Sequence, residues 1–316
     1  MLEVIKGGPS PRWATRILLA NLVGQVVIVV TGGIVRLTGS GLGCSTWPEC
    51  EPGQFTPVRH DASSWSPFIE FGNRTLTGVL VLLGVATVWA VWRGRPRALR
   101  HRLLGLVPLA MVLVQAVVGG LSVLVDLHPA VVGGHFLISM VLVAASTVLV
   151  VRHREDDVAP SPVVGAAVRR LAWAVGAVCV VVLVLGVVVT GSGPHSGDEE
   201  AAYRFALDPV RIARLHAAAV WLYVAGVGLL LALVGRARSA SAPAAAARRA
   251  TLVLLGVTLL QGVVGYVQYF TGLPAVLVAV HMLGACLLVI AQVRQLLALR
   301  TRTAMPHGFA PSHPTA

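Results

Sequence analysis

Eight long apolar stretches without charged residues constrain the fold of this chain more than any other feature. They cover residues 17–35, 75–92, 103–124, 136–151, 171–190, 215–234, 251–270 and 273–293. Most are close to the ~20 residues that an α-helix needs to cross ~30 Å of hydrocarbon. Their Val- and Leu-rich runs lack the two-residue alternation of a membrane β-barrel. The sequence therefore predicts an all-α integral membrane protein with eight transmembrane helices.

Composition supports this class, since 56% of the residues are hydrophobic and only 12% are charged, whereas about a quarter are charged in soluble domains. The first apolar stretch could be confused with a signal peptide. Its length of ~19 residues exceeds a typical signal core and no small-residue cleavage site follows it, so we expect a retained helix.

The distribution of charge argues against a nucleic-acid partner despite the net charge of +12. Nineteen of the 25 Lys and Arg residues flank the two termini and every second connection, and nine of the 13 acidic residues lie in the other connections. Basic connections are typical of the cytoplasmic side. We therefore expect a multi-pass protein of the cell membrane with both termini in the cytoplasm.

A segment of 21 residues occurs twice, as QAVVGGLSVLVDLHPAVVGGH from Gln115 to His135 and as QGVVGYVQYFTGLPAVLVAVH from Gln261 to His281. Seven positions are identical, including the Gln and the His at the two ends. The glutamines and nearby glycines are expected to serve helix packing. A buried histidine that recurs in register indicates a ligand held by the protein.

A second repeated phrase follows the first and fifth stretches, as GGIVRLTGSG (32–41) and GVVVTGSG (186–193). The repeat therefore covers a whole unit, and the sequence predicts two tandem four-helix bundles with pseudo-twofold symmetry along the membrane normal. The expected units are residues 1–155, with a long outer loop, and residues 156–300. Residues 235–250 are expected to be a flexible inner loop, and residues 301–316, rich in proline, a disordered cytoplasmic tail.

The long outer loop carries Cys44 and Cys50, with Trp47 and Pro48 between them. Outside the cytoplasm such a pair favours a disulfide, with free thiols or a redox-active pair as the alternatives. One such pair is too few ligands for structural zinc. Cys179 and Cys286 lie within predicted helices and are expected to be apolar core residues.

Three of the ten histidines, His135, His216 and His281, lie inside predicted spanning helices. An ionisable residue there indicates function by default, and the alternative is a neutral histidine hydrogen-bonded between helices. Helix geometry places all three imidazoles one or two turns below the outer surface. No cluster of thiols or carboxylates accompanies them, which disfavours zinc, whereas two axial imidazoles suit haem iron.

The two halves differ in the number of histidines that they offer. Alignment of IEFGNRTLTGVL (69–80) with RIARLHAAAVWL (211–222) places Asn73 opposite His216. The second half then has two ligands, His216 and His281, and the first half has His135 facing an amide. A haem with one histidine and a weak or absent second ligand leaves room for oxygen or substrate chemistry.

Glu70 shares a helix face with Asn73 and is a candidate for proton transfer or for stabilising a cationic intermediate. The alternative is a carboxylate at headgroup level that is paired with Arg74. Four outer-side arginines could bind haem propionates or lipid phosphates, namely Arg36, Arg74, Arg211 and Arg214.

Three features together resemble the haem A synthase family: GGIVRLTGSGLGCSTWPEC after the first helix, IEFGNRTLTG at the start of the second, and the paired histidine repeats. The resemblance runs from Arg16 to about Arg300. It implies that the chain oxidises the methyl group at ring position 8 of haem O to a formyl group. The product, haem A, would serve an aa3-type terminal oxidase. The implied partners are haem O synthase and oxidase assembly factors. Membrane lipid would surround the enzyme, which can oligomerise.

The family pattern implies a role for each matching residue. His216 and His281 would bind a haem b cofactor that relays electrons, and the first half, with His135, would receive haem O. Glu70 matches a functionally important carboxylate and would assist at the reacting methyl group, where Asn73 is the second candidate catalytic residue. Arg74 and Arg214 would contact the haem groups.

This chain departs from the family at two places. Asn73 stands where many members have histidine, so four-histidine ligation is not carried over. The second outer loop, 191–210, lacks a cysteine pair found in some members, whereas Cys44 and Cys50 match the first pair.

Two other functions fit the same helices. A haem electron carrier between quinol and an outer partner needs haems at two depths, whereas all candidate ligands here lie near the outer face. Haem or solute transport predicts interrupted helices at mid-membrane, and no convincing pair is present in the sequence.

Overall fold

The computed structural model describes residues 11–59, 64–94, 97–195, 197–198, 203–236 and 241–302. Within these ranges, eight helices are long and apolar enough to cross a membrane, which confirms the predicted all-α membrane class. They are α2 (Pro11–Leu37), α3 (Ser66–Arg93), α4 (Leu99–Leu124), α5 (Pro129–His153), α6 (Ala166–Ser192), α7 (Pro209–Gly235), α8 (Ala242–Phe270) and α9 (Ala275–Ala298).

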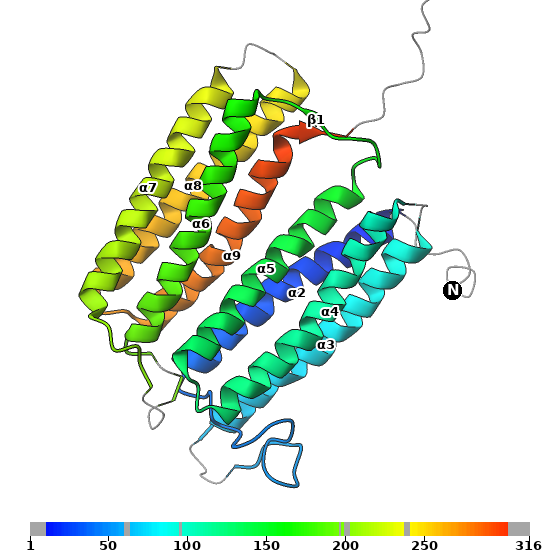
Figure 1. The fold of residues 1–316 in the computed structure, drawn as a ribbon. Coiled ribbons are helices and arrows are strands. Elements are labelled where there is room, and N and C mark those ends of the chain that lie inside the picture. The colour runs from blue at the N-terminus through cyan, green and yellow to red at the C-terminus, as the bar shows by residue number, and fades with distance from the viewer. Residues whose placement is uncertain are drawn as a thin grey trace, which may run out of the picture.

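The helices pack as two groups of four (Figure 1). In the first group α2 contacts α3 and α5, and α4 contacts α3 and α5; in the second, α6 contacts α7 and α9, and α8 contacts α7 and α9. The groups meet where α5 packs on α9, α2 on α9, and α5 on α6. If α2 and α6 swap places, and α5 and α9 swap places, the three contacts between the groups remain the same three. A pseudo-twofold relation between the groups would produce this pattern. The symmetry itself stays a prediction.

Helices α3 and α8 begin nine residues before the apolar stretches that start at residues 75 and 251, the largest such differences. Helix α3 starts at Ser66, with Pro67 in its first turn, and so includes Glu70 and Asn73. Helix α8 starts at Ala242, so the expectation of a flexible loop throughout 235–250 was wrong. Alanine favours helix, and the Ser241 side chain accepts a hydrogen bond from the Ala244 amide, which caps the helix.

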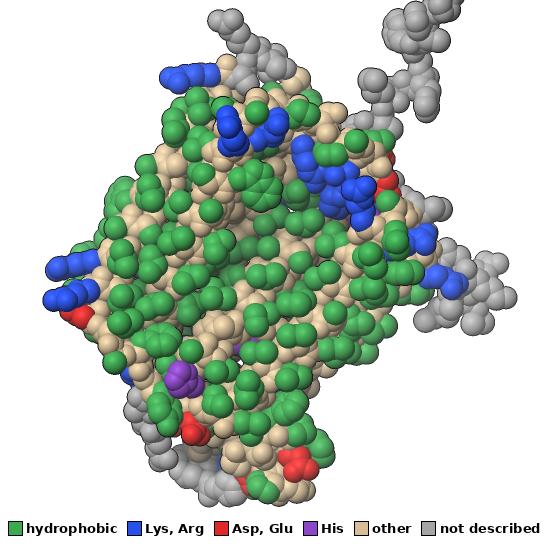
Figure 2. Space-filling view, viewed as in Figure 1, with side chains coloured by type: hydrophobic (Ala, Val, Ile, Leu, Met, Phe, Trp, Pro, Cys, Tyr) green, Lys and Arg blue, Asp and Glu red, His purple; other side chains and the backbone are tan. Residues whose placement is uncertain are grey.

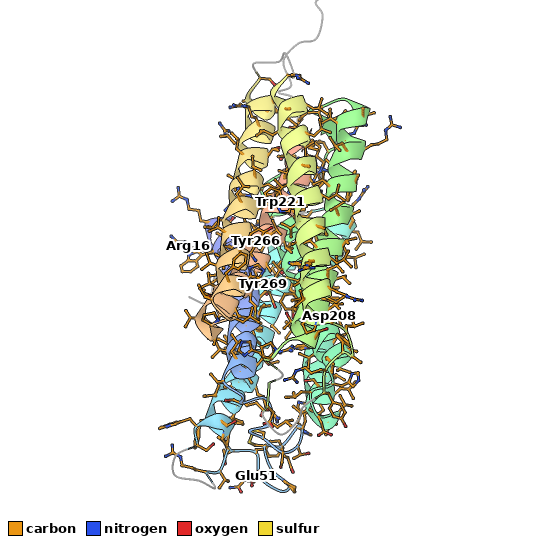
Figure 3. The ribbon with its side chains drawn as sticks, turned by 90° about the vertical axis from the view of Figure 1, so that its left-hand side faces the viewer. Arg16, Glu51, Asp208, Trp221, Tyr266 and Tyr269 are labelled. Atoms are coloured by element: carbon orange, nitrogen blue, oxygen red, sulfur yellow. A yellow bond between two sulfur atoms is a disulfide. The ribbon has the colours of Figure 1, made fainter. Side chains whose placement is uncertain are left out.

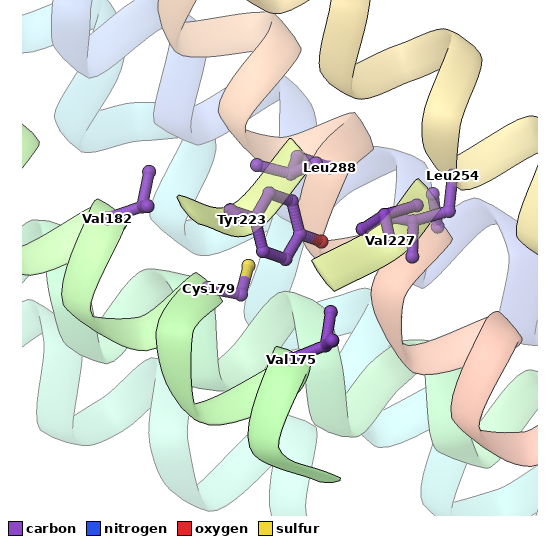
Figure 4. Close-up of a cluster of buried hydrophobic side chains, with 8 residues drawn as sticks. Val175, Cys179, Val182, Tyr223, Val227, Leu254 and Leu288 are labelled. Atoms are coloured by element: carbon purple, nitrogen blue, oxygen red, sulfur yellow. The ribbon is translucent and has the colours of Figure 1, made fainter. Parts of the chain in front are cut away.

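The core of the second group lies between α6, α7, α8 and α9 (Figure 4). Tyr223 is 1% exposed and donates a hydrogen bond of 2.6 Å to the side chain of Gln292, which satisfies a hydroxyl buried among apolar side chains. Cys179 belongs to this core, and Cys286 belongs to another between the two groups. The expectation that both are core residues is confirmed.

Polar and apolar side chains are segregated along the helix axes (Figure 2). Hydrophobic side chains cover the middle of the face shown, and Lys and Arg gather towards the end where β1 lies in Figure 1. Trp221, Tyr266 and Tyr269 lie on the outside of α7 and α8, where Trp221 donates a hydrogen bond of 2.9 Å to the Tyr266 hydroxyl (Figure 3). Such aromatic side chains suit contact with lipid.

A short antiparallel pair of strands closes the arginine-rich end of the molecule. Strand β1 (Ser161–Pro162), in the linker between the two groups, pairs with β2 (Arg300–Thr301) after α9. Thr301 and Arg302 therefore belong to the folded structure. Residues 303–316 of the expected tail lie outside the described residues.

Candidate functional site

The three helical histidines and Asn73 lie at one level. Counted from the first residue of their helices, His135 and His281 come six residues later, and Asn73 and His216 come seven residues later. At 1.5 Å per residue this places all four about 9–11 Å along their helices. Because α3, α5, α7 and α9 run in the same direction through the bundle, the four side chains share a depth near the end that carries the long loop.

A hydrogen bond between helices fixes the backbone at two of the histidines. Gln115 Nε2 donates to the His135 carbonyl oxygen at 2.9 Å, and Gln261 Nε2 donates to the His281 carbonyl oxygen at 2.6 Å. The first bond ties α4 to α5 and the second ties α8 to α9. The two copies of the repeated segment thus make the same contact.

The turn between each pair of helices is also shared. Leu127 and Leu273 both adopt positive φ angles, 55° and 60°, which is uncommon for leucine. Their amides donate to the carbonyls of Ser122 and Gln268, each at 2.8 Å. This common turn sets the register in which each glutamine meets its histidine.

A glycine faces each of the four side chains. A Cβ atom on Gly119 would lie 3.3 Å from His135 Cε1, and one on Gly265 would lie 3.2 Å from His281 Cε1. Gly186 bears the same relation to His216, at 3.3 Å, and Gly32 faces Asn73 Nδ2 at 3.7 Å. Because glycine has no side chain, each position leaves a flat space between neighbouring helices for the imidazole or amide that faces it.

The polar atoms of the histidines fit an axial-ligand role. In the described part of the chain, the Nδ1 atoms of His135, His216 and His281 are buried and have no hydrogen-bond partner. Burial of a polar group without a partner is costly, so structural hydrogen bonding does not account for the His135 and His281 side chains. Two imidazoles from facing helices at one depth match the axial ligation of a haem.

The described residues include no group of three or more His, Cys, Asp or Glu side chains suited to a metal ion. Haem has a different requirement, because the porphyrin supplies four nitrogen ligands and the protein adds only one or two. The donor set of separate imidazoles therefore fits haem.

The Asn73 amide has a hydrogen-bond partner on the neighbouring helix α2. The Thr31 hydroxyl donates to Asn73 Oδ1 at 2.7 Å. Thr31 and Gly32 are consecutive on α2, so one residue orients the amide and the next gives it space. The site in the first group is thus built around a single imidazole and an oriented amide.

Glu70 anchors the long loop to α3. Its side chain is 7% exposed, and Oε2 accepts a hydrogen bond of 2.7 Å from the Cys44 amide. Oε1 accepts from Arg74 Nε at 3.0 Å and from Arg74 Nη2 at 2.5 Å. The pairing with Arg74 that the sequence left as an alternative is therefore present. Charge-assisted bonds of this kind are stronger than neutral ones.

Arg74 extends this anchor further into the loop. Its Nη1 atom donates to the carbonyl oxygens of Thr46 and Glu49, at 2.9 and 3.1 Å. Its guanidinium is therefore engaged with the loop. The predicted contact between Arg74 and a haem group would have to compete with these bonds.

The predicted disulfide between Cys44 and Cys50 is present, and both cysteines are fully buried. Within this loop, Trp47 rests on α4, because a Cβ atom on Gly120 would lie 2.3 Å from Trp47 Cδ2. Gly119, the next residue, faces His135. The loop thus contacts α4 beside the imidazole of the first group.

The other outer-side arginines are placed differently. Arg36 donates to the carbonyl oxygens of His195 and Thr190, at 2.7 and 3.1 Å, and so ties α2 to the last turn of α6 and to the loop after it. Arg211 is 86% exposed by side chain and paired with Asp208. Arg214 is exposed on α7.

Several contacts at this site were not predicted from the sequence. The positions of Gly186 and Gly32 in the two repeated phrases were a usable signal for the ring-facing glycines. The anchoring of the loop by Glu70, and the contact of Trp47 with Gly120, depend on how the loop folds back, for which the sequence carries no periodic signal.

Residues 15–195, more than half of this 316-residue chain, match the family described as cytochrome oxidase assembly protein, COX15-CtaA. This segment includes the disulfide loop, Glu70, Asn73 and His135, and it ends before α7.

Curated relatives carry the name heme A synthase. The one from Lysinibacillus sphaericus (strain C3-41) is 34% identical over 137 residues, which are 42% of each chain. The one from Bacillus pumilus (strain SAFR-032) is 33% identical over 141 residues, 44% of each chain. The one from Halalkalibacterium halodurans is 27% identical over 172 residues, 53% of this chain and 56% of the relative. The chain thus spans about half the length of the curated relatives that it matches.

Proposed function

Because this chain belongs to the cytochrome oxidase assembly protein family COX15-CtaA, we propose that it is a haem A synthase. It oxidises the methyl group at ring position 8 of haem O to the formyl group of haem A, for use by an aa3-type oxidase. The names of its relatives support this activity. The observation that carries the proposal is the recurrence of the Gln–His and Gly–His contacts in both halves at one depth.

In the second group of helices, His216 and His281 would hold a haem b cofactor. Haem with two imidazole ligands supplies a one-electron carrier. Gln261 fixes the backbone at His281, and Gly186 and Gly265 give the two rings room to lie flat against their neighbours. The unpartnered Nδ1 atoms are consistent with rings whose position is set by packing and by ligation.

The first group of helices receives haem O as the substrate. His135 would hold the substrate iron, and Asn73, whose amide Thr31 orients, lies at the same depth on α3. Two hydroxylations at the methyl carbon, with molecular oxygen as the oxidant and with electrons and protons supplied from outside the site, would give a geminal diol, which loses water to form the aldehyde. Glu70 lies on the face of Asn73 one turn nearer the loop and assists at the reacting methyl group, while its bonds to Cys44 and Arg74 keep the loop closed over the site.

The enzyme works in the cell membrane with both termini in the cytoplasm and with haem O synthase and oxidase assembly factors as partners. The arginine-rich end of the helices supports this orientation. The common depth of the histidines favours a synthase over a transmembrane electron carrier, which needs haems at two depths.

Pigment analysis of membranes tests this function. A strain that lacks the gene should accumulate haem O and contain no haem A in pyridine haemochrome spectra, and the gene on a plasmid should restore haem A. The His135→Ala variant should fail to restore it, although the low-spin haem b signal of the purified protein remains. Normal haem A content in the deletion strain would exclude the proposed activity.

A further inference from the structure

A cavity of about 180 Å³ lies at the arginine-rich end of the molecule, opposite to the histidines. It is formed where the start of α4, the end of α5, the linker before β1 and the segment after β2 meet. Arg100, Arg152 and Arg302 line it together with Asp157, and Val158 and Pro160 contribute its apolar wall.

Cations outnumber anions around this cavity. Five arginines lie here, namely Arg97, Arg100, Arg152, Arg300 and Arg302, against the three acidic residues Glu155, Asp156 and Asp157. One oxygen atom, Glu155 Oε2, pairs with three arginines: Arg152 at 2.8 Å, Arg300 at 3.1 Å and Arg302 at 4.0 Å. Asp157 pairs in addition with Arg97 at 3.4 Å and with Arg152 at 3.6 Å, and five arginines against three acidic residues still give this end a net positive charge.

Arg302 has hydrogen-bonding capacity left over. Its Nη1 donates to the Val158 carbonyl at 2.7 Å, whereas its Nε lies 4.0 Å from Glu155 Oε2, too far for a hydrogen bond, and has no hydrogen-bond partner in the described structure. Burial lowers the pKa of Arg302, repulsion from Arg152, Arg300 and Arg100 lowers it further, and Glu155 opposes this. An additional anion in the cavity would relieve the repulsion and could accept the remaining donor.

The helix beside the cavity continues into a surface suited to acyl chains. Arg100 is exposed on α4, and Leu103, three residues later on the same face, is 50% exposed. Leu106, one turn further along, is 36% exposed. A basic pocket directly above an apolar lipid-facing stripe has the layout of a site for an anionic phospholipid.

We propose that this cavity binds the phosphate of an anionic phospholipid headgroup, with Arg100 and Arg302 as its main ligands and the acyl chains along Leu103 and Leu106. The lipid would sit where the linker between the two groups of helices meets the chain after α9. It would thereby stabilise the junction between the two halves. This proposal is independent of the proposed activity.

Measurement of bound lipid in the purified full-length protein tests it. The protein is exchanged into mixed micelles with phosphatidylglycerol or phosphatidylcholine, and retained lipid is counted by native mass spectrometry. Arg100→Gln removes a cavity arginine that takes no part in the hydrogen bonds and ion pairs described above. Arg249→Gln, at an exposed position on α8, is the matched control because it makes the same change in charge.

Wild-type protein and Arg249→Gln should retain phosphatidylglycerol in preference to phosphatidylcholine, and Arg100→Gln should weaken its retention about fivefold. Arg302→Gln should have the same effect, and its separate measurement guards against a folding defect in one variant. Equal retention by wild type and both cavity variants would overturn the proposal. Displacement of the lipid by inorganic phosphate, but not by chloride at equal ionic strength, would instead assign the cavity to a soluble anion.

Discussion

Gln261 on α8 donates a 2.6 Å hydrogen bond from Nε2 to the backbone carbonyl of His281 on α9. Hydrogen bonds between membrane helices contribute about 0.6 kcal/mol on average and at most about 1.7 kcal/mol. Its contribution to stability is therefore modest. Its more important effect is on position, because it fixes the segment of α9 that carries a proposed haem ligand.

Replacement of Gln261 should separate these two effects. Gln261→Leu removes the donor at similar volume, so we expect a loss of stability of about 0.5–1.5 kcal/mol and a clear fall in low-spin haem b per protein. Gln115→Leu is the matched control in the first half. It should lower haem A formation while the haem b signal is unchanged, as measured by absorbance spectra of purified protein. Loss of haem b in both variants to the same degree would contradict the assignment of the halves.

The glycine that faces His281 gives a test of ring packing. A Cβ atom on Gly265 would lie 3.2 Å from the ring, which is closer than ordinary van der Waals contact, so Gly265→Ala should shift the imidazole and weaken haem b binding. Gly256→Ala on the same helix has open space around it and should be neutral or stabilising by about 0.5–1 kcal/mol. Haem titration of the apoprotein distinguishes the two, and equal affinities would argue against close packing at Gly265.

Glu70 has both an anchoring and a proposed chemical role, and two variants distinguish them. Glu70→Gln retains an acceptor for the Cys44 amide but removes the charge, so we expect normal haem b, a largely retained loop and loss of haem A formation. Arg74→Gln breaks the ion pair and the bonds to Thr46 and Glu49 while keeping the carboxylate. Loop stability, measured by limited proteolysis, should fall more in Arg74→Gln. Full activity of the Glu70→Gln variant would contradict the proposed role of Glu70 at the methyl group.

The features predicted well from the sequence are those with a periodic or compositional signal. Eight apolar stretches gave eight helices, and residues in register in the repeat, Gln115 and Gln261, make the same contacts. The start of α8 was missed because Arg248 and Arg249 interrupt the hydrophobic stretch, although an alanine-rich segment with a Ser241 cap remains helical.

Contacts that depend on chain segments folding back on one another were not predicted. The bond from the Cys44 amide to Glu70, the contact of Trp47 with Gly120 and the pairing of β1 with β2 join residues without a common sequence pattern. Each requires knowledge of the path of a loop, which hydropathy and helix geometry do not give.

The proposed orientation can be checked by labelling thiols. In spheroplasts, an impermeant maleimide should label an Arg211→Cys variant without permeabilisation, because the Arg211 side chain is 86% exposed at the start of α7, on the proposed outer side. Cys179 and Cys286 are buried and should stay unlabelled until the protein is denatured. An Arg249→Cys variant should react only after the membrane is permeabilised. The reverse pattern would show that the protein is inserted the other way round.

Asp157 should make a pH-dependent contribution at the arginine-rich end. Burial alone would raise the pKa of Asp157, but the hydrogen bond from the Ala98 amide and the charges of Arg97, His101 and Arg152 outweigh it, so its pKa in the folded protein is lowered. A carboxylate whose pKa is lowered in the folded state stabilises the fold at pH values above its unfolded-state pKa of about 3.9. This stabilisation is lost as the pH falls through the folded-state pKa. Asp157→Asn should therefore lower the thermal midpoint at pH 6–7, by the equivalent of about 0.5–1.5 kcal/mol, and the difference from wild type should shrink below about pH 4. A difference that stays constant across this range would show that the charge of Asp157 is not what stabilises the start of α4.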